Sequence, residues 1–320
     1  MSIIDSLSAG YRFLIRHLYL VLLPVALDLV LWLSPRLTIA STMERVVDFY
    51  TQMAALDELP EEMAAMMSQT ATMMEGLGKS VNLLGFLVNS SLLHVPSLMV
   101  MLEPTPTATL LDISGWWRVL GLSILFAAIG ILLGVAYMSL LARVLPLGSA
   151  PKPSGWGEFV RLVIRHWLRL LLFVGLTIAI FAMCMLPVGL GVSLLSMLIP
   201  VAGGLLMVMV GGFVLVIFFY LFFVVPAIIV DDLSIAAAIS QSVLLVRNNF
   251  LPTIGFMFLS GLIAGGIGLI LSPVAEYGPV GLLVAIAVNA FVGSGLAMAL
   301  LVFYRTRLLR MTGGEELLAA

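Results

Sequence analysis

The chain has 320 residues, of which 62% are hydrophobic and only 10% are charged, and its mean hydropathy is +1.19. Because a soluble domain carries about a quarter of its residues as charged side chains, this composition excludes a soluble globular protein. We expect an all-α integral membrane protein whose surroundings are mostly lipid. The formal net charge of −2 is uninformative as a total, so the distribution of charge along the chain is considered instead, and no nucleic-acid partner is expected.

Six segments are apolar and each is long enough to cross a hydrocarbon core of about 30 Å. They cover residues 18–34, 116–142, 167–190, 203–226, 250–272 and 279–304. We interpret the first as a retained signal anchor, because residues 38–41 (TIAS) form a poor cleavage site. The single cysteine, Cys184, excludes an intrachain disulfide, and we expect it to be a buried apolar side chain.

Residues 35–115 form an insertion between the first two spans, and residues 81–102 within it are hydrophobic but interrupted by polar side chains and Pro96. If residues 81–102 do not cross and the N-terminus is cytoplasmic, eleven of the fifteen Lys and Arg residues fall inside. We therefore predict a bacterial plasma-membrane protein with six crossings, both termini cytoplasmic, residues 35–115 outside and 305–320 as a cytoplasmic tail. Segment 81–102 is then a re-entrant hairpin; a true crossing is the alternative.

A short phrase occurs three times: FLIRHLYL at residues 13–20, LVIRHWLRLLL at 162–172 and LLVRNNFLPTI at 244–254. Each copy precedes an apolar run, which predicts three parallel two-helix repeats, each preceded by an amphipathic helix in the membrane interface. The repeats cover residues 1–34 with 116–142, 146–226, and 227–304. Arg16, Arg165 and Arg247 would then lie at one depth.

Arginines of these interfacial segments are candidate ligands for phospholipid headgroups. In residues 156–167 the apolar and basic side chains fall on different helical faces, and residues 7–18 show a similar division. The candidates are Arg12, Arg16, Arg161, Arg165, Arg169 and Arg247. The alternative is that they only set the topology and anchor the helices by snorkelling.

Residues 226–250 read PAIIVDDLSIAAAISQSVLLVRNNF, a helix end at Pro226, an acidic pair and a small-residue helix that leads into the next span. This stretch resembles a bacterial multi-pass membrane domain that is fused to some glycerophosphodiester phosphodiesterases. The resemblance implies fold and membrane location but no catalysis, because the activity of those proteins belongs to a separate soluble barrel. Asp231, Asp232 and Ser234 are expected to satisfy free N–H groups at a helix start.

Asp28 is the main intramembrane candidate, because it lies about 18 Å beyond Arg16 along a helix. An ionisable residue at that depth is either functional or fastens its helix to polar groups of the 81–102 segment. Asn289, in the last span, is a weaker candidate. The full set of intramembrane polar candidates is Asp28, Asn82, Asn89, His94 and Asn289.

The insertion also predicts a helical hairpin in residues 37–79. Apolar residues recur at 4-3-4-3 spacing from Ile39 to Met53, and Pro60, Glu61 and Glu62 mark the start of a second helix. Its methionines are candidates for packing or for binding a partner protein. They are Met43, Met53, Met63, Met66, Met67, Met73 and Met74. A Cu(I) site is a minor alternative, and no metal or cofactor is expected.

Recognisable catalytic motifs are missing: the sequence has no phosphate-binding glycine loop, no His-Glu-x-x-His and no Gly-x-Ser-x-Gly. We therefore name no catalytic residue and expect a non-enzymatic accessory or scaffold subunit of a membrane complex. Its expected partners are phospholipids and a membrane protein or second copy bound through residues 37–79. The alternatives are a lipid or small-solute transporter with a cavity near Asp28, and, third, a membrane-embedded enzyme.

Overall fold

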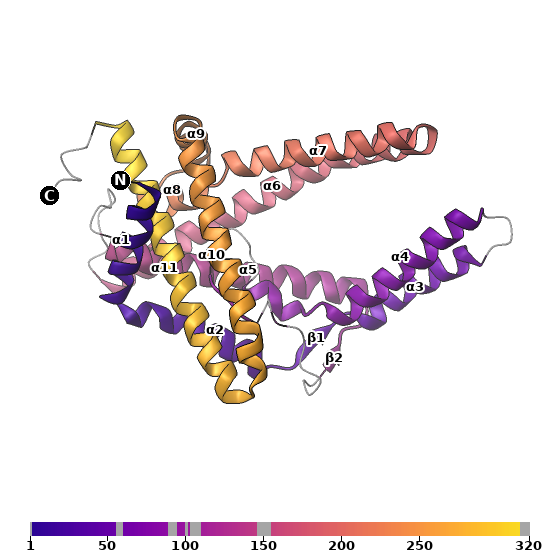
Figure 1. Cartoon of the computed structure of the whole chain (residues 1–320), viewed down its shortest axis with the longest axis horizontal. Coiled ribbons are helices and arrows are strands. Elements are labelled where there is room, and N and C mark those ends of the chain that lie inside the picture. Colours follow the sequence, from indigo (N-terminus) through magenta and orange to yellow (C-terminus); the bar gives the residue numbers. More distant parts are fainter. Residues whose placement is uncertain are drawn as a thin grey trace. The chain divides into compact units, whose positions relative to one another are not determined.

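A computed structural model describes residues 2–55, 60–88, 95–99, 102, 110–145 and 155–313. The chain is almost entirely helical in these ranges (Figure 1). The helices are α1 (Ile3–Ile15), η1 (Leu18–Val21), α2 (Leu22–Leu33), α3 (Ala40–Ala54), α4 (Glu61–Ser80), η2 (Leu83–Leu87), α5 (Trp116–Val144), α6 (Trp156–Leu198), α7 (Pro200–Tyr220), α8 (Val224–Asp231), α9 (Ile235–Asn248), α10 (Phe250–Glu276) and α11 (Pro279–Met311). Two short strands are β1 (Arg36–Thr38) and β2 (Leu110–Asp112).

Five stretches of helix are long and apolar enough to cross a membrane, which confirms the all-α membrane class. They are α5, α6, α7 together with α8, α10 and α11. The first predicted span differs, because α2 has only 12 residues, or about 18 Å of rise. It reaches a sixth crossing only if α1 and Leu18–Leu33 count together as one bent span.

The chain forms two compact units. Unit 1 comprises residues 1–20, 135–265 and 294–320, and unit 2 comprises residues 21–134 and 266–293. Helices α5, α10 and α11 contribute residues to both. The three two-helix repeats remain a prediction.

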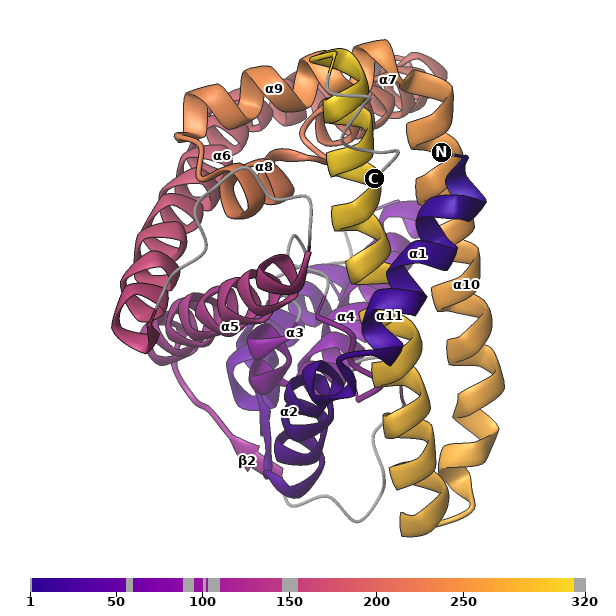
Figure 2. The same cartoon turned by 90° about the vertical axis from the view of Figure 1, so that its left-hand side faces the viewer.

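Helix α8 lies in the core of unit 1. All seven residues from Val224 to Val230 are buried, and α8 contacts α6 and α9 (Figure 2). The helix is interrupted between α7 and α8, and Ser242 of α9 pairs with backbone groups that this interruption leaves free. Its Oγ accepts from the N–H of Phe223 at 3.0 Å and donates to the carbonyl of Tyr220 at 2.7 Å. A helix break in an apolar environment is tolerated when a side chain satisfies the freed backbone groups in this way.

Helix α1 lies against α11 instead of presenting its apolar face to lipid. A Cβ added to Gly10 would lie 2.6 Å from the Cα of Ala299, so the two backbones are in direct contact. Leu7 and Leu14, on the apolar face of the predicted interfacial helix, are buried in the protein. The prediction from amphipathicity identified the buried face correctly and its partner wrongly, because periodicity does not distinguish protein from lipid.

The repeated phrase marks a helix break in two of its three copies. Helix α1 ends at Ile15, just before Arg16, and α9 ends at Asn248 with Asn249 as its cap. Helix α6 instead continues without a break through Arg165 and His166. The predicted second interfacial helix is therefore the N-terminal part of a 43-residue helix.

In unit 2, α3 and α4 form a helical hairpin, as predicted, and α4 begins at Glu61 directly after Pro60 (Figure 1). Helix α3 starts three residues later than expected because residues 36–38 form β1, which pairs in parallel with β2. The two strands flank the insertion and hold its ends together.

The described part of segment 81–102 is not one continuous helix. It contains the short 3-10 helix η2 and an irregular stretch at 95–99, while residues 89–94 lie outside the described ranges. Carbonyls of Phe86 and Leu87 contact α5 at Gly130, and Pro96 contacts α11 at Gly293. Irregular backbone covered by protein fits a non-crossing segment; its re-entrant course stays a prediction.

We predict that Gly10→Ala destabilises the protein, because the added methyl would overlap Ala299 and overpacking costs about 1–3 kcal/mol. Gly175→Ala on α6 is the matched control, since a Cβ there meets nothing within 4 Å. The control should be neutral or stabilising by up to about 1 kcal/mol, because alanine favours a helix. Thermal unfolding in one detergent compares them; equal midpoints would contradict the α1–α11 contact.

Candidate functional site

Asp231 lies in a nearly buried ion pair at the end of α8. Its carboxylate accepts hydrogen bonds from Arg305 Nη1 at 2.9 Å and from the Tyr304 hydroxyl at 2.5 Å, both on α11. Gln241 of α9 donates to the same hydroxyl at 2.5 Å. The side chains of Asp231 and Arg305 are 7% and 9% exposed, so water contributes little to their solvation.

Asp232 binds α6 in the same way. It accepts from Arg165 Nη2 at 2.5 Å and from Arg169 Nη1 at 2.7 Å, and it lies 3.1 Å from His166 Nε2. Arg169 also donates to the carbonyls of Asp232 and Leu233, which are free because α8 ends here. Asp232 has a positive φ of 54°, a left-handed conformation that closes the helix.

These two residues, the acidic clasp, therefore do not act as predicted. Asp231 and Asp232 pair with cations of α11 and α6 rather than satisfying free N–H groups of α9. Ser234 does occupy the N-cap position of α9, but its side chain makes no capping hydrogen bond. The local pattern of acidic and hydroxyl residues predicted a cap, whereas the arginine partners lie 63 to 74 residues away in sequence.

The clasp offers little to a substrate. His166 is fully buried and its Nδ1 has no hydrogen-bond partner, so it has no route to a reacting group. Both carboxylates are occupied by arginines. The ion pairs and hydrogen bonds of Asp231 and Asp232 hold α6, α8, α9 and α11 together within unit 1.

The six candidate headgroup arginines divide into two groups. Arg165 and Arg169 are engaged by Asp232, which the sequence did not indicate. The other four are exposed, and no ion pair joins them to a carboxylate of a described residue: Arg12, Arg16, Arg161 and Arg247. Headgroup binding stays a prediction, and it applies best to these four.

Asp28 is completely buried in unit 2 and its carboxylate is hydrogen-bonded. It accepts from the Ser97 hydroxyl and from the N–H of Leu98 at 2.8 Å. Leu98 belongs to an apolar cluster with residues of α10 and α11, against which Leu29 of α2 also packs. Asp28 thus fastens α2 to the irregular 95–99 stretch, through residues that the sequence did not identify as its partners.

The other intramembrane polar candidates have different positions. Asn82 Oδ1 accepts from the N–H groups of Leu37 and Leu84, so it joins β1 to η2. Asn289 is buried in α11. Asn89 and His94 lie outside the described residues.

The base of the α3–α4 hairpin is held by polar contacts that the sequence did not reveal. Asp112 of β2 accepts from the N–H of Ser41 at 3.2 Å and so caps α3 from a distant segment. The Ser41 hydroxyl beside Asp112 and the backbone N–H groups of Ser41 and Ala40 hold the pKa of Asp112 below its ordinary value. Thr42 donates to the carbonyl of Ile113 at 2.9 Å, and Arg36 donates to the carbonyl of Ser80 at 2.9 Å.

The seven candidate methionines fall into two groups that differ in exposure. Four are only partly exposed and lie on the faces by which α3 and α4 pack: Met43, Met53, Met67 and Met74. The contact of Gly78 with Met43 fixes the antiparallel register of that packing. The other three are exposed on α4, at 40% for Met63, 69% for Met66 and 62% for Met73. Internal packing therefore accounts for about half of the predicted partner surface.

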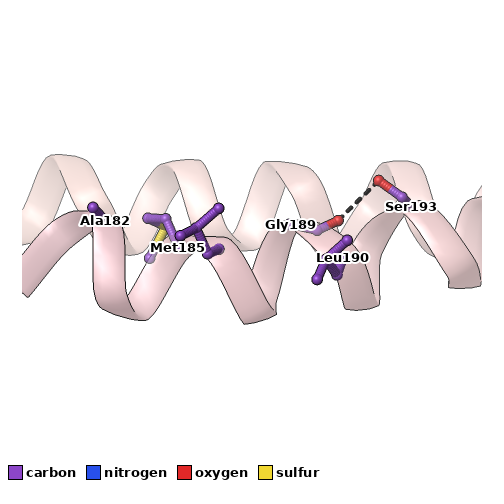
Figure 3. Close-up of a pocket in the computed structure, with 6 residues that line it drawn as sticks. Ala182, Met185, Gly189, Leu190 and Ser193 are labelled. Atoms are coloured by element: carbon purple, nitrogen blue, oxygen red, sulfur yellow. Dashed lines mark hydrogen bonds between the residues drawn. The ribbon is translucent and has the colours of Figure 1, made fainter.

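A groove on α6 provides no catalytic alternative. It is lined by Ala182, Met185, Leu186, Gly189, Leu190 and Ser193 (Figure 3). Its polar side chain, Ser193, already donates to the carbonyl of Gly189 at 2.9 Å. Cys184 on the same helix is exposed, not buried as predicted, because the apolar surface of α6 extends beyond the packed core.

Among the described residues, no group of three or more His, Cys, Asp or Glu side chains could hold a metal ion. Comparison with protein-family models, with curated proteins and with solved structures finds no match to this chain.

We predict that Arg305→Met costs more stability than Arg165→Met. The first removes the arginine paired with the buried Asp231 carboxylate, and breaking a buried pair typically costs about 3–5 kcal/mol. Arg165 is 50% exposed and Asp232 keeps Arg169, so its loss should cost about 1 kcal/mol or less. Thermal midpoints in the same detergent measure both; a larger loss for Arg165→Met would reverse the assignment of the buried pair.

Proposed function

We propose that this chain is a non-enzymatic multi-pass membrane protein, an accessory or scaffold subunit that binds a membrane-protein partner through its α3–α4 hairpin. One observation supports the proposal above others: the hairpin is fastened at its base by paired strands and by four separate polar side chains. A plain connecting loop needs no such attachment. A hairpin held at its base, with exposed apolar side chains, is suited to binding another protein.

The competing functions receive less support. Asp28 is enclosed by protein groups and makes two hydrogen bonds, which favours a structural role over a transport site. The clasp carboxylates are occupied by arginines, so neither is favoured as the base of an enzyme. Transport through a cavity near Asp28 would require Ser97 and Leu98 to release it.

We further propose a bacterial plasma-membrane location with six crossings, both termini cytoplasmic and the hairpin outside. The charge asymmetry of the loops supports this orientation. In this topology the exposed arginines of α1, α6 and α9 serve as phospholipid contacts on the cytoplasmic side. The resemblance of residues 226–250 to the phosphodiesterase-fused membrane domain is proposed as a likeness of fold only.

Cysteine labelling tests the topology in three positions. Ser2→Cys, Thr51→Cys and Thr312→Cys, each in a Cys184→Ala background, place thiols at exposed residues. Five long helical stretches separate Thr51 from Thr312, so an impermeant reagent should label them from opposite sides. Ser2 should label with Thr312. Labelling of Ser2 together with Thr51 would mean that the bent pair does not cross.

Excision of the hairpin tests the proposed function. Arg36 and Leu37 contact Ser80 and Asn82, so the two ends of the hairpin are close enough for a short Gly-Ser linker to replace residues 40–80. We expect the shortened protein to remain folded and to lose a stoichiometric partner that co-purifies with the full chain in mild detergent. Gly175→Ala is the matched control and should keep the partner. Retention of the partner after excision would overturn the proposal.

A further inference from the structure

Helix α1 reaches the level of the middle of α11. Near its start, Ile3 contacts α10 at Gly255, five residues after that helix begins. Farther along, Tyr11 contacts α11 at Gly295, near the middle of a helix of 33 residues, and Figure 2 shows α1 lying along it. Because the middle of a spanning helix lies in the hydrocarbon core, the residues that follow Tyr11 are at a depth where the surroundings are apolar.

The chain continues in the same direction after α1. In unit 2, three apolar side chains of α2 pack against a cluster that includes Ile286 of α11, which is nearer than Gly295 to the start of that helix. Between these two contacts with one continuous helix, the chain carries Arg12 and Arg16. Both arginines are therefore deeper than Arg247, which directly precedes α10. Arg16 and Arg247 thus differ in depth, although the repeated phrase predicts the same depth for them.

An exposed polar face runs along α1 and contains both arginines. Its four members recur at 3-4-4 spacing and are all exposed: Asp5, Ser8, Arg12 and Arg16. No ion pair joins either arginine to a carboxylate of a described residue. Asp5 lies two turns from Arg12 and accepts from the N–H of Ser2 at 2.6 Å. Ile15, between the two arginines in sequence, is 57% exposed, so an apolar surface adjoins the polar face.

Two unpaired guanidinium groups at this depth need a counter-charge. A charged side chain inside a membrane is costly, and it typically faces a polar pathway or a bound ion. Arg12 and Arg16 are one turn apart, which places their Cβ atoms about 5–6 Å from each other, and like charges at this spacing repel. A phosphate between them would offset the repulsion and accept paired N–H groups from each planar guanidinium.

We propose that Arg12 and Arg16 bind a phosphate group below the level of the headgroup layer. This inference rests on the phospholipid contacts of the proposed function and gives two of them a ligand and a depth. An anionic phospholipid and free phosphate both offer the group. The apolar surface at Ile4 and Ile15, which are 67% and 57% exposed, favours the lipid because acyl chains can cover it.

Fluorescence quenching of the full chain in nanodiscs tests the depth. Ile15→Cys and Leu251→Cys, each in a Cys184→Ala background, place a bimane label at exposed positions of α1 and of the first turn of α10. Nitroxides on a deep acyl carbon should quench the label at Ile15 most, and nitroxides on the headgroup should quench the label at Leu251 most. Stronger quenching at Ile15 by the headgroup nitroxide would place this end of α1 at the membrane surface and overturn the proposal.

Native mass spectrometry of the full chain in detergent with phosphatidylglycerol tests the ligand. Arg12→Gln with Arg16→Gln removes both cations of the site, and Arg161→Gln with Arg247→Gln is the matched control, because it removes two other exposed arginines. We expect the α1 variant to bind one lipid at least about tenfold more weakly and the control to bind it as the unmodified chain does. Equal weakening would mean that surface charge alone attracts the lipid. Unchanged binding by the α1 variant would mean that the arginines only anchor the helix by snorkelling; either result overturns the proposal.

Added inorganic phosphate distinguishes the two sources of the group. Displacement of the lipid from the unmodified chain would identify free phosphate as a ligand of the same site, whereas a lipid that stays bound identifies the phospholipid. Unchanged helical circular dichroism and thermal midpoints, expected because all four substituted arginines are exposed, exclude unfolding as the cause of lost binding.

Failure of this inference and failure of the proposed function give different results. If hairpin excision removes the native partner but the α1 variant keeps its lipid, the phosphate site alone is wrong. If the native partner survives excision while the α1 variant loses its lipid, the partner-binding function alone is wrong.

Discussion

Backbone groups that helix ends and irregular stretches leave unpaired must be satisfied inside an apolar fold, and this constraint organises both units of the protein. In each case the partner comes from a distant segment. Ser242 completes the break between α7 and α8, and Arg169 binds the free carbonyls at the end of α8. Asp28 binds the N–H of Leu98, and Asp112 binds that of Ser41.

The constraint explains why so many polar side chains inside the apolar regions lack an obvious catalytic use. A carboxylate that accepts from a backbone N–H or from an arginine is stabilised where it lies, and releasing it would leave both partners unsatisfied. Asp28, Asp231 and Asp232 are all held in this way. A buried ionisable residue in such a chain is then evidence of an unpaired backbone group or a cation nearby before it is evidence of chemistry.

The sequence predicts the long helices well and their breaks poorly. Composition alone identifies α5, α6, α10 and α11, because a long apolar run in lipid must pair its own backbone groups and does so as a helix. A break depends on a distant side chain, and nothing near Leu221 in sequence indicates that Ser242 lies there. The predicted interfacial helix before the second repeat is likewise not separate, because α6 continues through Arg165.

In the hairpin too, periodicity alone does not determine which face of a helix is buried. Spacing places Met66 and Met67 on adjacent faces of α4 but does not say which face meets another helix. The structure assigns Met67 and Met74 to the contact with α3, because Gly78 and Met43 fix the register of the two helices. Packing satisfies one stripe within the hairpin and leaves its neighbour exposed at Met66 and Met73. Since both stripes are apolar and only one has a partner in the described chain, the unpaired stripe is the better indicator of an external contact.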